Sequence, residues 1–312
     1  MDSPLVSVVL PVHNRSDVVA EALTSVLRQT YTALEVIVVD DGCTDTSMDE
    51  VRRVADARVR IVHNDGPRGA ASARNCGIAH ATGRYLAFQD SDDRWHPEKL
   101  AVQLHTLTSG GNEAVVLVGS EWRLMRDAER DPMVSVSTAV TRCSRNDVLG
   151  GVLTGTIGTP TLLIDRERAA TAPSFDVEFP SLEERDFVYR LLPDGPGTLA
   201  VCNSVLVDVR RGRTDHVANP TGSLAGYERF LTKYPDELAA LRGAADWYHE
   251  RAMREALILR QRRRARGHLR AIGRRELRLS LEYLLGFLFG YYGLAVITRA
   301  RLAPRLARRI RG

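Results

Sequence analysis

The sequence predicts an α/β fold, in which a mainly parallel sheet is flanked by helices and followed by a basic, helical C-terminal tail. In the first 110 residues, short apolar runs rich in valine and isoleucine alternate with segments of helical periodicity. Strands without a polar face are typical of a parallel sheet that helices cover on both sides. A second change of character comes at residue 251, where the sequence becomes rich in arginine.

Each element of the first 110 residues has a local reason. Runs of β-branched residues closed by Pro, Gly, Asn or Asp predict strands at residues 6–14, 34–42, 59–64 and 83–90. Apolar residues at helical spacing predict helices at residues 16–29, 47–55, 69–80 and 95–107. Ser16 or Asp17 suits the N-cap of the first helix, and Pro97 suits the first position of the last.

The remaining sequence is less regular up to about residue 215. Strands are expected near residues 114–119, 161–164 and 198–209, and a helix is expected over residues 181–192. The pattern becomes helical from about Tyr227. We therefore predict one domain over residues 1–226, with halves at 1–110 and 111–226, and a helical, arginine-rich region over residues 227–312.

Composition and charge limit the possible settings of the protein. The four cysteines are far apart and form no C-x-x-C pair, which favours reduced thiols in a cytosolic protein. The first residues lack a basic segment and a small-residue cleavage site, so no signal peptide is expected. Residues 251–312 carry 17 arginines and 3 glutamates, a charge of +14, whereas the 26 basic and 36 acidic side chains before them give −10. This division indicates a polyanionic partner, either a membrane surface or nucleic acid.

Acidic and polar residues follow three of the predicted strands. They are Pro11–Asn14, Asp40–Asp41 and Asp90–Asp93. Because ligands of parallel sheets bind beyond the carboxyl ends of the strands, we expect these residues along one rim. A divalent cation bridging a nucleotide diphosphate would explain the carboxylates, although a solvated acidic loop would also fit the D-x-D spacing. The dinucleotide fingerprint and the P-loop are both missing, which argues against a dehydrogenase or an NTPase.

Four segments, in order and spacing, resemble the signatures of family 2 glycosyltransferases. They are "VSVVLPVHN", "EVIVVDDGCTD", "GAASARNCGIAHATGRYLAFQDSDD" and "SLEERDFVYRLL". The resemblance extends from residue 5 to about residue 216. It implies a GT-A-type, Rossmann-like fold and an inverting enzyme that uses a nucleotide-diphosphate sugar. It also implies that residues 1–110 bind the nucleotide sugar and that residues 111–226 bind the acceptor.

The resemblance assigns the nucleotide pocket to residues of the first half. Pro11 and Val12 would line it, although both could simply end a strand. Asp41 would read the edge of the base, with Asp40 beside it. Arg74, in "ARN", matches a family position near the nucleotide, but an arginine paired with a rim aspartate is an equally good interpretation.

The acidic cluster and a late histidine are assigned to the sugar and the metal. By the resemblance, Asp90 and Ser91 would approach the ribose or the sugar. Asp92 would be the principal ligand of Mg²⁺ or Mn²⁺, with Asp93 either a supporting ligand or an N-cap. His216, in "RRGRTDHVAN", would be a ligand of the metal or the phosphate from the second side.

The catalytic base of the family is an aspartate in an E-D pair that opens a helix. This sequence has "SLEERDF", so Glu184 falls at the position of the base, after Glu183 and before Asp186. Inverting transfer needs a base to take the proton of the acceptor hydroxyl. Glu184 is the first choice and Asp186 the second, because glutamate is one methylene longer than the expected aspartate. A charged helix start, favoured by the helix dipole, is the structural alternative.

The tail contains sixteen mostly apolar residues, Tyr283–Thr298, between arginine-rich flanks. A helix of that length would span about 24 Å, less than the roughly 30 Å hydrocarbon core, so we expect it in the membrane interface with arginines on anionic headgroups. A buried or dimer-forming helix is the alternative. Nucleic-acid binding ranks lowest, because the apolar stretch would have no role in it.

The predicted function is an inverting, metal-dependent glycosyltransferase, cytoplasmic and peripheral on the inner face of the cell membrane. It would move a sugar to a polysaccharide, glycan or lipid-linked acceptor. The alternatives are a sugar-phosphate nucleotidyltransferase, which usually has a Gly-rich loop after the first strand, and a sugar-nucleotide-binding scaffold without a base. The sequence predicts neither the sugar nor the oligomeric state.

Overall fold

The computed structural model describes residues 3–109, 115–125, 140–151, 158–210 and 219–272. These residues fall into two compact units. The second unit takes residues 179–182 and everything described from residue 219 onward, and the first unit takes the rest. The predicted boundary at residue 226 therefore lies inside a helix of the second unit, and the predicted division at residue 110 lies outside the described residues.

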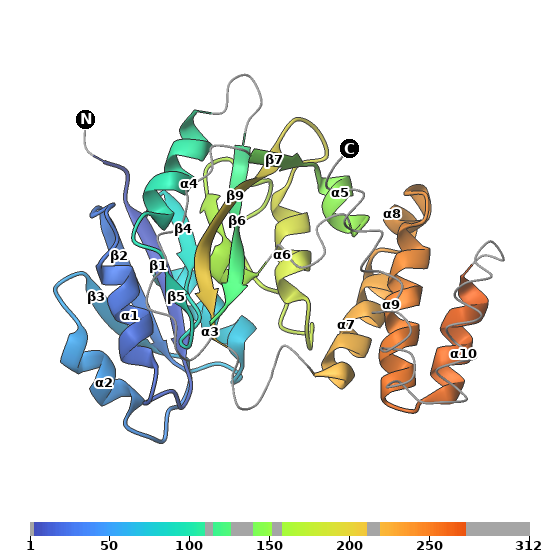
Figure 1. The fold of residues 1–312 in the computed structure, drawn as a ribbon, viewed down its shortest axis with the longest axis horizontal. Helices are drawn as coiled ribbons and strands as arrows, with labels where there is room; N and C mark the ends of the chain where they lie inside the picture. The colour runs from blue at the N-terminus through green and yellow to red at the C-terminus, as the bar shows by residue number, and fades with distance from the viewer. Residues whose placement is uncertain (1–2, 110–114, 126–139, 152–157, 211–218, 273–312) are drawn as a thin grey trace. The chain divides into compact units, whose positions relative to one another are not determined.

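The first unit is built on one mixed sheet of nine described strands (Figure 1). Its parallel part has the order β3-β2-β1-β4, formed by Val59–His63, Leu34–Asp40, Val6–Val12 and Tyr85–Phe88. Following the chain, β2 and β3 are added on one side of β1, and β4 is then added on its other side. A parallel sheet binds its ligands where the strand order reverses in this way, which here is at the carboxyl ends of β1 and β4.

The second part of the sheet is mixed. β8 (Leu163–Asp165) runs antiparallel to both β4 and β6 (Val115–Leu124), and β9 (Thr198–Val209) runs parallel to β6. Two short strands complete it on β9, namely β5 (Arg94–Trp95) and β7 (Val140–Cys143). The sequence analysis missed both of these, and it assigned Trp95 to a helix.

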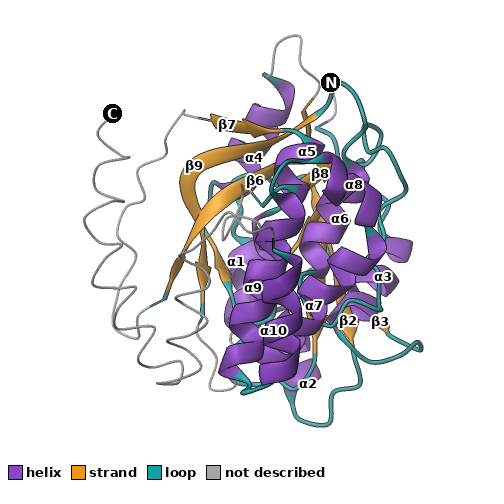
Figure 2. Ribbon diagram, turned by 90° about the vertical axis from the view of Figure 1, so that its right-hand side faces the viewer, coloured by secondary structure: helices purple, strands orange, loops and turns teal. Residues whose placement is uncertain are grey.

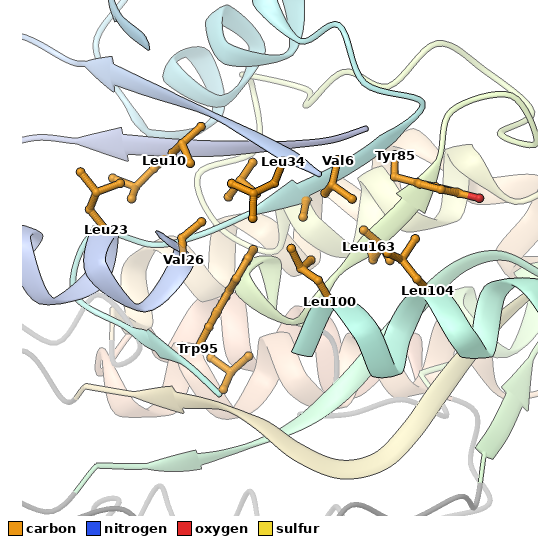
Figure 3. Packing of buried hydrophobic residues seen from close by; sticks show 14 of the residues in the cluster. Val6, Leu10, Leu23, Val26, Leu34, Tyr85, Trp95, Leu100, Leu104 and Leu163 are labelled. Atoms are coloured by element: carbon orange, nitrogen blue, oxygen red, sulfur yellow. The ribbon is translucent and has the colours of Figure 1, made fainter. Parts of the chain in front are cut away.

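Helices cover both faces of the parallel strands, as the sequence predicted. One face packs on α1 (Val19–Leu27), α2 (Ser47–Val54) and α4 (Lys99–Thr108), and Figure 3 shows part of this core. The other face carries α3 (Ala70–His80), where a side chain at Gly77 would lie 2.3 Å from Val9. α6 (Glu183–Leu191) lies on this face too, since Phe187 meets Phe88 edge to face. Alternating side chains of each strand therefore feed two separate apolar layers.

Two predicted helix starts are wrong. The N-cap of α1 is Val18, without a side-chain cap, because Ser16 instead donates its backbone N–H to Asp45 at 3.3 Å. α4 begins at Lys99 and not at Pro97, because the residues before it are drawn into pairing with β9. The short helices α5 (Arg145–Leu149) and η1 (Thr159–Thr161) complete the described elements of the first unit.

The second unit is helical, as predicted, but begins earlier than Tyr227. Its helices are α7 (Pro220–Lys233), α8 (Pro235–Ala240), α9 (Ala244–Ile258) and α10 (Arg262–Ala271), and Figure 2 shows α9 beside α10. The segment 179–182 lies against α7, where Gly226 leaves no room for a side chain below the Ser181 carbonyl. No helix within the described ranges has the length and hydropathy to cross a membrane. The apolar stretch Tyr283–Thr298 lies outside them.

Candidate functional site

The two acidic segments and the polar segment Pro11–Asn14 lie at the carboxyl ends of adjacent parallel strands. The backbone N–H of Asp41 donates to the Val12 carbonyl at 2.9 Å, which joins the end of β2 to the end of β1. The N–H of Gln89 donates to the Val9 carbonyl at 2.9 Å, which holds the start of the next loop beside β1. We call Asp40, Asp41 and Asp90–Asp93 the acidic rim.

The end of β1 serves mainly as a frame for this rim. Val12 is buried in the core beside α1, and its carbonyl accepts from the backbone of Asp41 and, at 3.3 Å, from the Cys43 thiol. Pro11 is partly exposed. His13 follows, with Nδ1 lying 2.9 Å from the Asp41 carbonyl oxygen. The side chain of Val12 is therefore structural, and only Pro11 of the predicted pair is open to a ligand.

The Asp40–Asp41 pair is held by the loops around it. Asp41 is buried, and its carboxylate accepts from Asn64 Nδ2 at 2.7 Å and from the Gly69 N–H at 2.9 Å. Asp40 accepts from the Cys43 N–H at 2.8 Å. Burial alone would raise the pKa of Asp40, but this hydrogen bond and nearby His63 outweigh it and hold the pKa below its usual range. Asp41 shapes the loop that leads into α3.

Arg74 links the acidic rim to the start of α6. This arginine is only 5% exposed, and its two terminal nitrogens donate to Asp90 at 2.8 Å and to Glu183 at 3.0 Å. Burial would lower the pKa of Arg74, but the charges of Asp90 and Glu183 raise it above its usual value. The Nε–H of Arg74 is buried and has no acceptor among the described residues. Of the two interpretations of Arg74, pairing with a rim aspartate is the one that the geometry supports.

The turn Asp90–Asp93 concentrates negative charge. Burial, together with the charge of Asp90, raises the pKa of Asp92 and raises that of Asp93 to about 8. Asp93 is 5% exposed and accepts from the Arg210 N–H at 2.9 Å, whereas Asp92 is partly exposed and only 3.6 Å from Arg15 Nε. Ser91 lies between these residues and is partly buried.

These carboxylates fit a divalent cation if phosphate and water supply most of its ligands. No three ligand residues converge among the described residues. However, Mg²⁺ usually takes one or two protein carboxylates and leaves its other positions to phosphate and water. Asp92 fits that role, because a cation would relieve the repulsion that raises its pKa. Asp93 fits better as a support, because its carboxylate is directed at the backbone of Arg210. His216 lies outside the described residues.

The glutamates that open α6 stand in different environments. Glu183 is bound by Arg74, while no described residue donates a side-chain hydrogen bond to Glu184. Burial and the adjacent charge of Glu183 raise the pKa of Glu184 to about 7, against the opposing effect of Arg185 and Arg74. Asp186 is 0% exposed and pairs with Arg190 Nε at 2.8 Å.

Two arginines at the site were missed by the sequence analysis. Arg15 lies beside Asp92, and Arg210 reaches the Asp92 carbonyl at 3.3 Å through Nε. Arg15 directly follows "PVHN", at the end of a strand that leads to the rim. Its position in the sequence could therefore have predicted that it lies at the site. Arg210 could not be placed in the same way, because it reaches the turn only through the pairing of β5 with β9.

Comparisons with known proteins agree with this architecture. Residues 7–155 match the model of "Glycosyl transferase family 2". TuaG of Bacillus subtilis, named as a teichuronic acid biosynthesis glycosyltransferase, is 32% identical over 184 residues, 58% of this chain and 68% of that protein. WfaP of Escherichia coli, a UDP-Glc:alpha-D-GlcNAc-diphosphoundecaprenol beta-1,3-glucosyltransferase, is 41% identical over 101 residues. That match covers 32% of this chain and 40% of the length of WfaP.

Solved structures share the fold. Staphylococcus aureus TarS 1–349, solved with UDP-GlcNAc, superposes with a TM-score of 0.56 at 14% identity, over 86% of this chain and 90% of that one. The mannosyltransferase PcManGT of Pyrobaculum calidifontis was solved with GDP-Man and Mn²⁺. It superposes with a TM-score of 0.56 at 18% identity, over 96% of this chain and 87% of that one. The chain belongs to glycosyl transferase family 2 and has the GT-A-type fold that its sequence predicted.

Proposed function

We propose that this protein transfers a glycosyl group, with inversion, from a nucleotide-diphosphate sugar to an acceptor hydroxyl. One observation carries the proposal: Arg74 joins Asp90 of the acidic rim to Glu183, the neighbour of the candidate base. A donor bound at the rim would thus lie next to a proton acceptor.

Glu184 is the proposed base. With a pKa of about 7, its carboxylate is about half ionised at neutral pH, which suits a group that must accept a proton during the reaction. The acceptor oxygen would form a bond to the anomeric carbon as the bond to the diphosphate breaks, and its proton would pass to Glu184. Asp186 is an unsuitable base, because it is fully buried and paired with Arg190.

The leaving diphosphate needs positive charge. Arg15 and Arg210 converge on the turn at Asp92 and would bind phosphate oxygens there. Asp92 would hold the Mg²⁺ or Mn²⁺ ion that the family implies, with Asp93 in support. Such an ion neutralises the charge that develops on the diphosphate.

We further propose a UDP-linked donor and a lipid-linked glycan acceptor at the inner face of the membrane. The activity for which WfaP is named, with UDP-Glc as donor and a sugar on diphosphoundecaprenol as acceptor, supports this choice. The complex of TarS with UDP-GlcNAc supports the same nucleotide.

The test is a transfer assay with the purified full-length chain, Mn²⁺ or Mg²⁺, and a panel of UDP-, GDP- and dTDP-sugars. The acceptor is a GlcNAc-diphosphate-lipid analogue, and NMR of the product reports the anomeric configuration. Glu184→Gln should lower kcat by about 10²–10⁴-fold, the range for loss of a general base. Asp92→Asn, or chelation of the metal, should abolish transfer.

Glu167→Gln is the matched control, because this exposed glutamate lies on the loop after β8 and should leave the rate unchanged. Transfer that survives Glu184→Gln at the wild-type rate would remove this residue from the mechanism. Donor binding by calorimetry without turnover of any acceptor would favour the non-catalytic scaffold.

A further inference from the structure

The helix α10 presents four exposed arginines on one face. Arg262, Arg266 and Arg270 are spaced by four residues, and Arg263 lies beside the first, so all four fall within about 100° of the helix circumference. Gly267 lies next to them without a side chain, and the same residues line a hollow of about 460 Å³. We call these four residues the α10 arginine face.

The rest of α10 is fixed, so the arginine face has one orientation within its unit. Ala265 is fully buried and packs with Ile272 in an apolar cluster with α7 and α9. His268 Nε2 lies 3.1 Å from Glu228 of α7. Arg264, a fifth arginine on the packed side, donates from Nε to Glu228 at 3.1 Å. The helix therefore cannot turn its arginines inward without breaking these contacts.

Three residues of this face, Arg263, Arg266 and Arg270, lack among the described residues counter-charges of the kind found on α2. On α2, Arg52 pairs with Asp49 at 2.9 Å, as is common for residues three or four positions apart. α10 contains no acidic residue, and Arg263, Arg266 and Arg270 form no ion pair within the described chain. Like charges one turn apart destabilise a helix. A face that accumulates them points to an anionic partner outside the chain.

We propose that the α10 arginine face binds the anionic headgroups of a lipid bilayer. Because the four arginines lie on one side of a helix about 15 Å long, all four can contact a flat membrane surface at the same time. α10 has no Phe, Tyr or Trp on which the bases of a single strand could stack, and its one histidine, His268, is turned toward Glu228 of α7. In the sequence, the arginines precede the apolar stretch Tyr283–Thr298, which lipid can accommodate and nucleic acid cannot. The surface is independent of the proposed activity, although it would suit a lipid-linked acceptor.

The test uses the full-length chain and two kinds of vesicle, pure phosphatidylcholine and phosphatidylcholine with 30% phosphatidylglycerol. In the test variant, glutamine replaces the four residues of the α10 arginine face. The control variant removes the same charge from four arginines that have acidic partners in the first unit, Arg52, Arg53, Arg58 and Arg60. Circular dichroism and melting curves check that both variants fold. We expect this because glutamine is a good helix former, which suits the positions in α10 and α2, and because Arg58 and Arg60 are at least partly exposed.

The wild type should sediment with the anionic vesicles and not with the neutral ones, and 0.5 M NaCl should release it. An arginine near an anionic surface contributes about fivefold to the partition constant, so the test variant should bind at least tenfold more weakly, and the control within twofold of the wild type. Equal binding of the test and control variants would overturn the proposal, as would equal binding of the wild type to neutral vesicles. A DNA duplex that displaces the wild type from the anionic vesicles, and fails to bind the test variant, would assign the face to nucleic acid instead.

Discussion

The pairing of Arg74 with Glu183 makes an unusual prediction for the pH dependence of the reaction. If Glu184 is the base, kcat/KM rises with pH through the pKa of that residue, which is about 7. Glu183→Gln removes a neighbouring negative charge and should lower this pKa. Arg74→Gln removes a positive charge and should raise it. The two variants should therefore move the acid limb of the pH profile in opposite directions.

The magnitude follows from the arrangement of the charges. Glu183 and Glu184 are adjacent at the start of α6. Two unit charges about 7 Å apart at an effective dielectric constant of about 20–40 interact by about 1–2 kcal/mol, and we take this magnitude for the pair. This corresponds to a shift of roughly one pH unit in either variant. Arg74→Gln should also destabilise the fold, by about 3 kcal/mol, because it leaves two partly buried carboxylates without their cation.

The measurement is kcat/KM of each variant between pH 5 and pH 9, at saturating metal, with urea unfolding as the check on stability. Direct titration of ¹³C-labelled glutamate by NMR, with Glu184→Gln to assign the signal, gives the same pKa without any turnover. Shifts in the same direction, or an unmoved acid limb in both variants, would refute the assignment of Glu184 as the base. Arg52→Gln, on exposed α2, should leave the profile unchanged.

Further predictions concern stability and its dependence on pH. Burial lowers the pKa of Lys99 from 10.5 to about 7, so the unfolded state binds this proton more tightly, and the protein loses stability as the pH falls from about 10 to about 7. K99M should raise the free energy of unfolding at pH 7 by about 2 kcal/mol and flatten this slope in urea titrations, and a net loss at pH 7 would contradict the reasoning. G77A should cost about 2–3 kcal/mol in the same assay, because its Cβ would lie 2.3 Å from Val9 Cγ1; an unchanged midpoint would show that the strand side chain can yield. Nδ1 of His249 lies 3.0 Å from Nδ1 of His268, and burial and the neighbouring ring lower the pKa of His249, so this contact should be lost as the pH falls below about 6.5. Protection factors in α9 and α10, which are exchange rates corrected for the intrinsic rate at each pH, should then fall between pH 7.5 and pH 5.5 in the wild type but not in H249Q. An equal fall in both proteins would place the effect elsewhere.

Much of the parallel half of the fold could be predicted, because its signals are local. Apolar runs such as Leu34–Asp40 are too uniformly hydrophobic to be exposed on either face, and each was found as a strand. The mixed half depends on distant partners. Arg94 and Trp95 form a strand only because they pair with residues 207 and 208 of β9. No local pattern in residues 90–100 predicts that pairing.

The candidate site shows the same division. Motif order predicted Glu184 as the first choice of base and Asp186 as the second. Helical periodicity could have separated the two residues, since residues two positions apart face opposite sides of a helix. The full burial of Asp186 agrees with that argument. The role of Arg74 as a bridge could not be predicted, because it needs Asp90 and Glu183 on either side of one guanidinium.

The bridge also has a consequence for how the protein is made. Arg74 and Glu183 are 109 positions apart in the sequence. Strands β1 to β4 require only the first 88 residues, and α6 begins at Glu183. During synthesis the four strands can therefore pair before α6 has left the ribosome. Until α6 emerges, the guanidinium of Arg74 has Asp90 as a partner but not Glu183. The acidic rim can therefore form early in synthesis, whereas the candidate base can join it only after more than half of the chain has been translated.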